Sequence, residues 1–362
     1  NYYWPFVEDD LADQNVLPMV RKSSNADAVE LVDCGDVRYV PGATGNTDYV
    51  IVASFDVTNK TASIDSEVIM GSTGDVYVSR DNLYLAEAKY DYEYWYGDSG
   101  DDEETYIYRF KLDGDKVSYD GVGNVPGTVL NQFSMDEDGD YFRLATTTGG
   151  WWSANGTEKN NVYVLDKDLK VVGAVEGLAT GETIYSTRFI GDRLYMVTFE
   201  QIDPLFVVDL SNPSAPKVLG QLKIPGVSQY LHPLDEDHII GFGQDAVDAG
   251  DWSWFQGIKL SLFDVSDVNA PKEVDSVVIG DRGSYSELLY NHKALLFDAN
   301  KGIMAFPVTV AEIPQKVKDD LNLDSWVYGD YVFQGAYVYD VDVNGFDLKG
   351  TISHYGEDEL GN

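Results

Sequence analysis

The chain has 362 residues, of which 44% are hydrophobic and 13% aromatic, which is enough apolar material for a core and excludes a disordered chain. Its 62 acidic residues outnumber 25 lysines and arginines, and the formal net charge of −37 argues strongly against nucleic acid or anionic membrane surfaces as partners. A cation-rich setting, specific Ca²⁺ sites or plain solvated acidity would each account for this charge.

Short alternating runs bounded by Gly, Asn, Asp and Pro predict strands along most of the chain. Residues 1–48 form an N-terminal extension with two strand-like runs, at 28–32 and 37–40. An isolated strand pair follows at 49–59 and 62–70. This pair has the character of the outer half of a four-stranded unit.

Complete units of four strands, which we call A to D in chain order, follow the isolated pair. Their A strands are expected to begin near the residues Asp75, Gln132, Tyr185, Gln229 and Ser286. The last D strand is expected at 346–354, before a C-terminal tail at 356–362. The repeated domain therefore covers residues 49–355.

One segment reveals the period of these units. Residues 205–217 recur at 260–272, with Asp, Ser, Ala, Pro and Lys in the same register 55 positions later. Periods of about 50 residues are typical of kelch-type propeller blades. The unit between these limits divides into strands at 185–190, 193–199, 204–210 and 217–224.

The predicted fold is therefore all-β, a β-propeller of four-stranded antiparallel blades with five full blades plus a half blade. The ring would hold six blades, with seven as the alternative. The only helix expected lies within residues 310–321 and begins near Pro314, inside a long insertion.

Closure of the ring is open at this stage, because the half blade lacks its A and B strands. The extension at 1–48 is the first candidate to supply them. The second interpretation is that the chain is a piece of a longer protein. The third is that a neighbouring molecule donates the strands, which would polymerise the protein.

Residues 125–308 resemble one known family, and the segments that carry the resemblance are 130–136, 145–149, 203–207, 230–233 and 260–266. The family consists of secreted prokaryotic proteins with a C-terminal β-propeller distantly related to WD40 repeats. The resemblance implies a secreted archaeal or bacterial surface protein. The family supplies no established activity, and its members continue past the point where this chain stops, which favours a fragment.

Tryptophan is concentrated in the long B–C connections, which share one face of a propeller with the D–A connections. The aromatic residues singled out on this face are Tyr94, Trp95, Trp151, Trp152, Trp252, Trp254 and Trp326. One interpretation is a recognition surface for a protein or carbohydrate partner, because long loops on a rigid scaffold commonly bind ligands. The other is that the aromatics pack on one another and stiffen the loops.

Acidic turns make Ca²⁺ the only cofactor to consider. Asp340, Asp342 and Asn344 begin a calcium-loop pattern, but Thr351 stands where the twelfth-position glutamate belongs. A hairpin turned at Asn344 and Gly345 also fits and is the favoured interpretation. Two denser turns contribute the candidate ligands Asp98, Asp101, Asp102, Asp136, Asp138 and Asp140. A bound cation or solvent would relieve the repulsion in each.

Other local signals are weaker. A single cysteine, Cys34, excludes an intrachain disulfide, and no apolar run is long enough to span a membrane. Asn59 and Asn155 begin N-glycosylation sequons, as in a secreted glycoprotein. No signal peptide is visible, so the chain reads as a mature form or a fragment.

Catalysis has little support. The Gly-Asp-Ser-Gly string at 97–100 lacks the histidine and aspartate of a serine-protease triad and is interpreted as chance. His232 and His292 end successive A strands, where they either approach the channel as metal ligands or satisfy turns. We therefore expect a non-enzymatic extracellular or cell-surface module for binding, adhesion or assembly, possible self-assembly included. The alternative is a secreted hydrolase at the channel mouth.

Overall fold

The computed structural model describes residues 17–21, 24–25, 27–40, 48–59, 64–71, 74–89, 103–149, 158–199, 203–224, 226–248, 253–319, 327–353 and 355. By the density of its contacts the chain divides into two compact units. The first comprises Asn1–Lys89 with Tyr106–Asn124, and the second comprises Tyr90–Thr105 with Val125–Asn362.

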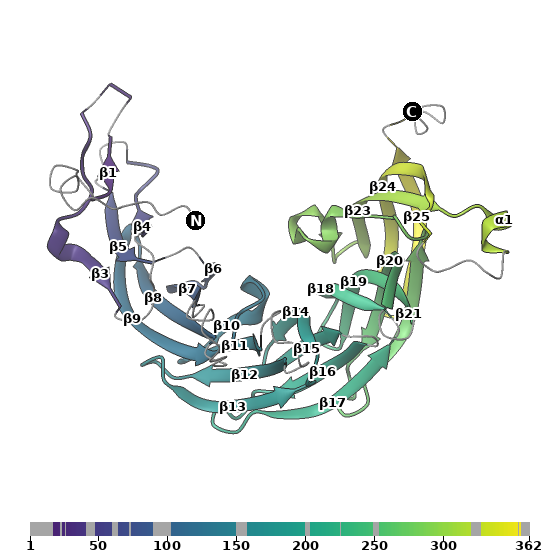
Figure 1. Cartoon of the computed structure of the whole chain (residues 1–362), viewed down its shortest axis with the longest axis horizontal. Coiled ribbons are helices and arrows are strands. Elements are labelled where there is room, and N and C mark those ends of the chain that lie inside the picture. The colour runs from purple at the N-terminus through teal and green to yellow at the C-terminus, as the bar shows by residue number, and fades with distance from the viewer. Residues whose placement is uncertain are drawn as a thin grey trace, which may run out of the picture. The chain divides into compact units, whose positions relative to one another are not determined.

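The second unit contains four antiparallel blades, each with four strands hydrogen-bonded in chain order (Figure 1). Their strands are β10 (Met135–Asp138), β11 (Tyr141–Thr148), β12 (Lys159–Leu165) and β13 (Val171–Leu178); β14 (Thr183–Ile190), β15 (Arg193–Phe199), β16 (Asp203–Asp209) and β17 (Lys217–Ile224); β18 (Val227–Pro233), β19 (His238–Asp248), β20 (Ser253–Asp264) and β21 (Lys272–Ile279); β22 (Leu296–Asp298), β23 (Ile303–Glu312), β24 (Asp330–Asp342) and β25 (Gly345–Ser353).

A fifth four-stranded sheet lies largely in the first unit, and its strands are β6 (Asp75–Val78), β7 (Asn82–Lys89), β8 (Glu104–Asp113) and β9 (Lys116–Pro126). The predicted all-β propeller architecture is confirmed, as are its five full blades. The bounds of β15 and β17 coincide with the predicted strands at 193–199 and 217–224.

The predicted half blade is a three-stranded sheet. β4 (Tyr49–Ser54) pairs antiparallel with β5 (Asp65–Met70), and β3 (Val37–Tyr39) pairs parallel with the far edge of β5. The extension thus adds its strand next to the D strand instead of supplying A and B beside β4. The short strands β1 (Met19–Val20) and β2 (Val29–Glu30) pair with each other, and a 3₁₀ helix, η2 (Cys34–Asp36), precedes β3.

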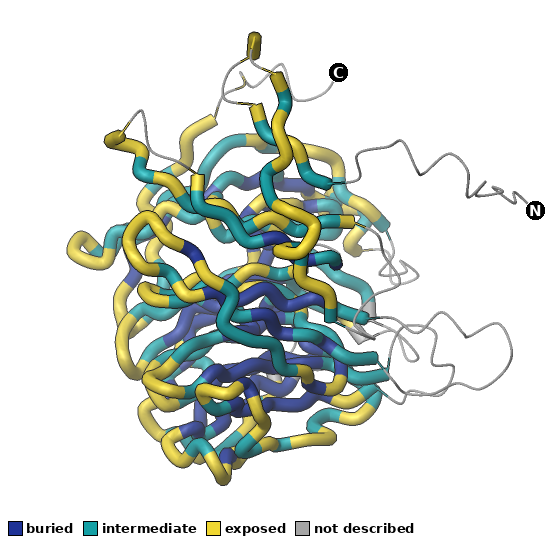
Figure 2. The backbone as a smooth tube through the Cα atoms, turned by 90° about the vertical axis from the view of Figure 1, so that its left-hand side faces the viewer, coloured by how far each residue is buried: buried dark blue, intermediate teal, exposed yellow. Residues whose placement is uncertain are grey.

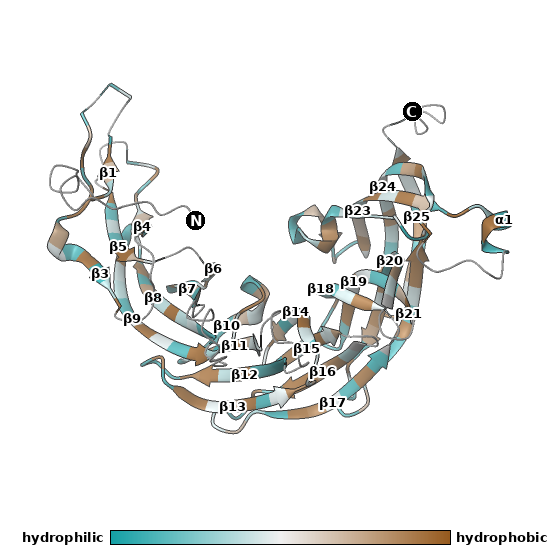
Figure 3. Cartoon of the chain, viewed as in Figure 1, coloured by the Kyte–Doolittle hydropathy of each residue, from teal (hydrophilic) through white to brown (hydrophobic). Residues whose placement is uncertain are grey.

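The core lies in the middle strands of each blade. All but the first residue of β12 and β15 are buried, and the side chains of β15 pack against the blades on either side of it. The outer strand β21 instead alternates between exposed and half-buried residues. Figure 2 shows the buried stretches inside the blades and exposed residues at the turns, and Figure 3 shows hydrophobic and hydrophilic residues interspersed along β13 and β17.

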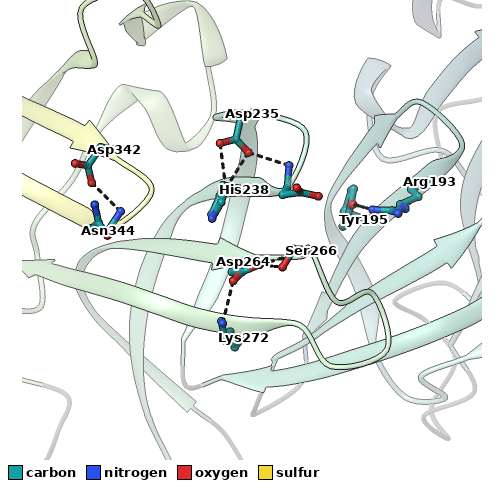
Figure 4. A network of polar contacts seen from close by, with 10 residues as sticks. Arg193, Tyr195, Asp235, His238, Asp264, Ser266, Lys272, Asp342 and Asn344 are labelled. Carbon is teal, nitrogen blue, oxygen red and sulfur yellow. Dashed lines mark hydrogen bonds and ion pairs between the residues drawn. The ribbon is translucent and has the colours of Figure 1, made fainter.

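The sequence repeat is explained by the C–D turn. Asp264 ends β20, its Oδ1 accepts the Ser266 backbone N–H at 2.9 Å, and its Oδ2 lies 2.9 Å from Lys272 Nζ at the start of β21 (Figure 4). Asp209 accepts the Ser211 N–H at 2.9 Å in the same way. The repeated Asp-x-Ser is therefore a side-chain-closed turn that starts each hairpin.

Two D-strand glycines let neighbouring blades approach. A Cβ placed on Gly173 would lie 2.1 Å from the carbonyl oxygen of Pro213, and one on Gly220 would lie 2.4 Å from that of Val268. In both cases the C–D turn of the next blade rests on the glycine backbone. Close blade packing therefore requires glycine at these positions.

The helix expected to begin near Pro314 is present: α1 (Gln315–Lys318) starts directly after Pro314 and is a single turn. The first residues of the segment 310–321 belong instead to β23, whose pairing with β24 reaches Glu312. One expectation about local structure was wrong. The A strands expected near Gln132 and Ser286 are broken by 3₁₀ helices: η4 (Gln132–Ser134), η5 (Glu287–Leu289) and η6 (His292–Ala294).

Side-chain caps explain these breaks. Asn131 accepts the Phe133 N–H at 2.9 Å, Ser286 accepts that of Leu288 at 3.2 Å, and Asn291 accepts that of Lys293 at 3.2 Å. Asn and Ser side chains compete in this way with sheet pairing for the backbone. Among the described residues no helix has the length and apolar character needed to cross a membrane.

Candidate functional site

The predicted aromatic face is described in part. Trp254 lies within the described residues, and those outside them are Tyr94, Trp95, Trp151, Trp152, Trp252 and Trp326. The expected loop at 243–257 is mostly a hairpin, because β19 and β20 continue pairing past a bulge, with Ala246 opposite Phe255 and Val247 opposite Trp254. Trp254 is therefore held on a strand.

Arg282, in the D–A connection after β21, organises the described part of this face. Its guanidinium carbon lies 4.5 Å from the ring centroid of Trp254 and 4.5 Å from that of Tyr328. Its Nη1 donates to the Phe255 carbonyl at 3.0 Å, and its Nη2 donates to the Tyr328 hydroxyl at 3.2 Å. Cation–π contact on both rings and two hydrogen bonds fix the three side chains together.

The array continues onto the preceding blade. Phe255 stacks on Phe199 with ring centroids 5.3 Å apart, and Phe199 meets Tyr185 edge-on at 5.4 Å. We call the set Tyr185, Phe199, Trp254, Phe255, Arg282 and Tyr328 the aromatic array. It joins three successive blades, so packing within the loops accounts for part of the aromatic content, while Tyr328 remains 66% exposed.

Sequence reasoning missed Arg282 because it considered only aromatic residues of the B–C loops. The signal available was the Asp-Arg-Gly sequence at 281–283, directly after a D strand. Gly283 has φ +106°, and a Cβ there would lie 3.3 Å from the Tyr328 ring. Glycine therefore allows both the turn and the close approach of the ring.

The acidic turn between β10 and β11 is neutralised by an arginine. Arg143, 5% exposed, donates from Nε to Asp136 at 2.9 Å and from Nη1 to Asp138 at 3.3 Å. Burial raises the pKa of Asp136, and Arg143 opposes that rise. The cation beside the first two predicted ligands is thus a side chain, and Ca²⁺ at Asp136, Asp138 and Asp140 stays a prediction.

The run at 340–344 forms the tip of the β24–β25 hairpin. Asp342 pairs with Gly345 across the turn, and its Oδ1 accepts the Asn344 N–H at 2.7 Å (Figure 4). Asp340 is held 2.7 Å from Lys349 Nζ on the neighbouring strand. The hairpin interpretation therefore accounts for Asp340, Asp342 and Asn344, with the turn one residue earlier than expected.

Of the remaining acidic metal ligands and glycosylation sites predicted from the sequence, only Asn59 lies within the described residues. Asp98, Asp101, Asp102 and Asn155 lie outside the described residues, as does the Gly-Asp-Ser-Gly string. Asn59 is exposed in the turn after β4, where its N–H donates to the Asp56 carbonyl at 3.2 Å. Within the described ranges, no three His, Cys, Asp or Glu side chains are grouped as metal ligands.

His232 and His292 are brought together around Tyr230: His232 lies on the inner strand β18, and His292 lies in η6, which precedes the inner strand β22. The Tyr230 hydroxyl lies 3.0 Å from His232 Nδ1, and the Tyr230 ring centroid lies 6.1 Å from that of His292. Phe297 contacts His232 edge-on at 4.5 Å. Burial, reinforced by the charge of Arg188, lowers the pKa of His232 to about 4.

Phe133 links these rings to the blade that begins the second unit. The ring centroid of Phe133 lies 4.8 Å from that of His292 and 5.5 Å from that of Tyr230. The guanidinium carbon of Arg188 lies 4.7 Å from the Phe133 ring centroid. We call Phe133, Arg188, Tyr230, His232, His292 and Phe297 the central cluster. It draws on the inner strands of all four blades of the second unit.

The first unit contains a cavity of about 720 Å³ that sequence reasoning did not anticipate. Carboxylates and one arginine are prominent in its lining, and several of these groups are engaged with one another. Arg38 lies 3.2 Å from Glu67 and 4.7 Å above the ring of Tyr119, and Asp65 accepts the Val117 N–H at 2.9 Å.

Four-stranded antiparallel blades hydrogen-bonded in chain order define the chain as a β-propeller protein. It belongs to the family described as the beta propeller domain, whose model matches residues 6–362. This assignment confirms the propeller part of the resemblance; secretion, a C-terminal position of the propeller and kinship with WD40 repeats remain predictions.

Two curated archaeal proteins, each described as uncharacterized, are similar in sequence. A protein of Archaeoglobus fulgidus is 42% identical over 230 residues, covering 64% of this chain and 34% of the relative. One from Methanocaldococcus jannaschii is 44% identical over 218 residues, covering 60% of this chain and 33% of the relative. The chain thus spans about a third of the length of the curated relatives it matches.

Solved structures match this chain with lower sequence identity. A protein from Lactobacillus plantarum has a TM-score of 0.45 and 13% identity, with 84% of this chain and 82% of that chain covered. BamB from Moraxella catarrhalis has a TM-score of 0.39 and 11% identity, with 77% and 72% covered.

Proposed function

We propose that this chain is a non-enzymatic binding module of the cell exterior, with the aromatic array at the centre of its recognition surface. The observation that carries the proposal is the guanidinium of Arg282 clamped between Trp254 and Tyr328. Aromatic and arginine side chains dominate the energetics of binding surfaces. Here they are held in place before any ligand arrives.

Preorganisation is the physical reason for choosing this face. Ordering a rotamer-rich side chain on binding costs about 0.5–1.5 kcal/mol. Hydrogen bonds from Arg282 to the Phe255 carbonyl and the Tyr328 hydroxyl already order this surface. Tyr328 still presents a largely exposed ring, which can stack on a sugar or enter a pocket of a partner protein.

The extracellular setting is supported by the sequence. Asn59 in an exposed turn, the acidic excess and the resemblance to secreted proteins all favour it. Stabilisation by Ca²⁺ and self-assembly belong to the same proposal. The hydrolase alternative would be recognised by turnover of polysaccharide, lactone or peptide substrates that is abolished by a substitution in the central cluster.

The test compares Tyr328→Ala with Tyr331→Ala. Both tyrosines are exposed, at 66% and 60%, but only Tyr328 belongs to the aromatic array. Binding to an array of neutral and acidic glycans, and self-association by sedimentation velocity, are measured in buffer containing Ca²⁺. We expect Tyr328→Ala to weaken the interaction at least tenfold, about 1.4 kcal/mol, and Tyr331→Ala to leave it unchanged.

Two results would count against the proposal. One is a wild-type protein that stays monomeric and binds none of the glycans. The other is equal binding by the two variants, which would place recognition elsewhere on the molecule.

A further inference from the structure

The central cluster concentrates positive charge in a strongly acidic protein. Arg188 lies beside His232 and His292, and Lys293 follows directly in the chain. Two carboxylates close to His292 in sequence are engaged elsewhere: Glu287 accepts from Asn291 Nδ2 at 2.8 Å, and Asp298 pairs with Lys301 at 2.8 Å. The positive charge of Arg188 acts on both histidines, and that of Lys293 acts on His292.

Arg188 stacks on aromatic rings and, among the described residues, is not paired with a carboxylate. Arg38, Arg109 and Arg143 each form an ion pair with a carboxylate, whereas the half-buried Arg193 and Arg282 bond to tyrosine hydroxyls. The guanidinium carbon of Arg188 lies 4.7 Å from the Phe133 ring centroid and 5.8 Å from that of Tyr230.

This arrangement leaves the guanidinium able to bind an anion. Stacked rings occupy the faces of a guanidinium, whereas its N–H donors lie in its plane and form a fork that matches a carboxylate. Arg188 is half-buried, so part of its side chain is exposed to solvent. Phe133 contacts His292 and Phe297 contacts His232, and both rings supply apolar surface in the cluster that suits a hydrocarbon group on the anion.

We propose that the central cluster is a binding site for an organic carboxylate, held by the guanidinium fork of Arg188. The Tyr230 hydroxyl and the His292 ring flank the carboxylate, and Phe133 and Phe297 contact its apolar portion. The carboxylate belongs either to a free small acid or to the C-terminus of a peptide. This site is separate from the aromatic array and does not depend on the function proposed for it.

The cluster is rigid enough to act as a preformed site. Ser134 Oγ and Thr187 Oγ1, both buried, lie 2.8 Å apart and tie η4 to β14. Ser186 Oγ donates to the Ser228 carbonyl at 2.6 Å and ties β14 to β18. Arg188 and Tyr230 are therefore set on inner strands that are hydrogen-bonded to each other.

Titration of the full chain with benzoate and acetate tests the proposal, with sodium chloride replaced to keep ionic strength constant. Constant ionic strength matters because any salt screens a net charge of −37. We expect benzoate to bind at least tenfold more tightly than acetate, because only benzoate has a ring that can contact Phe133 and Phe297. A tripeptide ending in Phe, with a free or an amidated C-terminus, separates the two sources of the carboxylate.

Histidine NMR signals report the location of binding, because the chain has only four histidines. Benzoate should shift the ring signals of His232 and His292 and leave that of His238, in the β18–β19 turn, unchanged. Arg188→Gln should weaken binding at least tenfold, and Arg193→Gln on β15 should not. Arg188→Lys, which keeps the charge without the fork, should weaken it to an intermediate degree if Arg188→Gln fails to fold.

The proposal is overturned if benzoate leaves the His232 and His292 signals in place, or if Arg188→Gln and Arg188→Lys bind as the wild type does. Equal binding of benzoate, acetate and chloride would also overturn it, since that result describes charge screening alone.

Discussion

Replacing Arg143 by methionine tests how the acidic β10–β11 turn is stabilised. Methionine retains an apolar stem in a position that is 5% exposed, but it leaves Asp136, 23% exposed, without its cation. Removing one partner of a buried ion pair costs about 3–5 kcal/mol, and the 57% exposed Asp138 adds little. We expect the free energy of unfolding to fall by about 3 kcal/mol, equivalent to roughly 4–6 °C in Tm for a chain of this size.

The pH dependence of this loss has a defined sign. Burial raises the pKa of Asp136, and Arg143 opposes the rise, so the variant should have a still higher pKa at this carboxyl. A folded-state pKa above the unfolded value destabilises the protein above that pKa and ceases to do so as the pH falls through it. The difference between wild type and Arg143→Met should therefore be largest at pH 7 and shrink toward pH 4.

Urea denaturation followed by circular dichroism at constant salt measures both effects. Lys301→Met is the control, because the Lys301–Asp298 pair is exposed and its loss should cost less than about 1 kcal/mol. Added Ca²⁺ should restore part of the stability of Arg143→Met, because the carboxylates then lack their arginine. A loss below about 1 kcal/mol at pH 7, or one that does not vary with pH, would refute the reasoning.

Two further predictions concern packing and protonation. Gly220→Ala should destabilise the protein by about 2 kcal/mol, because its Cβ would lie 2.4 Å from the Val268 carbonyl oxygen. Gly350→Ala is the control and should be neutral, because no atom lies within 4 Å of a Cβ at that position. Equal urea midpoints for the two variants would contradict this prediction. Burial and then Arg188 lower the pKa of His232 to about 4, so wild type should lose about 2 kcal/mol between pH 6.5 and 4 as the unfolded chain takes up the proton first. His232→Gln should remove this loss, and parallel stability curves for the two proteins would show that His232 is not its source.

Local patterns predicted the parts of the fold that local chemistry determines. Strands β15 and β17 begin and end where turn residues interrupt the alternation, and the repeated Asp209 and Asp264 mark the same side-chain-closed turn. Each of these features depends on residues close in sequence. They could therefore be derived without knowing how the blades pack.

Features that depend on distant residues were missed. The array around Arg282 needs Trp254 and Tyr328 from two different hairpins, and neither the period of the repeat nor the spacing of tryptophans indicates that they meet. β3 pairs parallel with β5. The alternating sequence of such a short strand does not indicate which edge of the β4–β5 pair it will join. Such contacts follow from tertiary packing, which a single sequence does not display.

The inner strands of the blades that contain β10 and β22, which are broken by 3₁₀ helices, also depend on contacts between distant residues. β14 and β18 show that a nearly regular A strand is available to this repeat, yet the blades of β10 and β22 give up sheet pairing for capped 3₁₀ turns. Those turns carry Phe133 and His292, whose rings meet 4.8 Å apart beside Arg188. Departures from local regularity concentrate at functional sites, where a required geometry outweighs the lost strand pairing. The irregular strands therefore favour a binding role for the central cluster over a role in packing alone, because packing would be served as well by four regular blades.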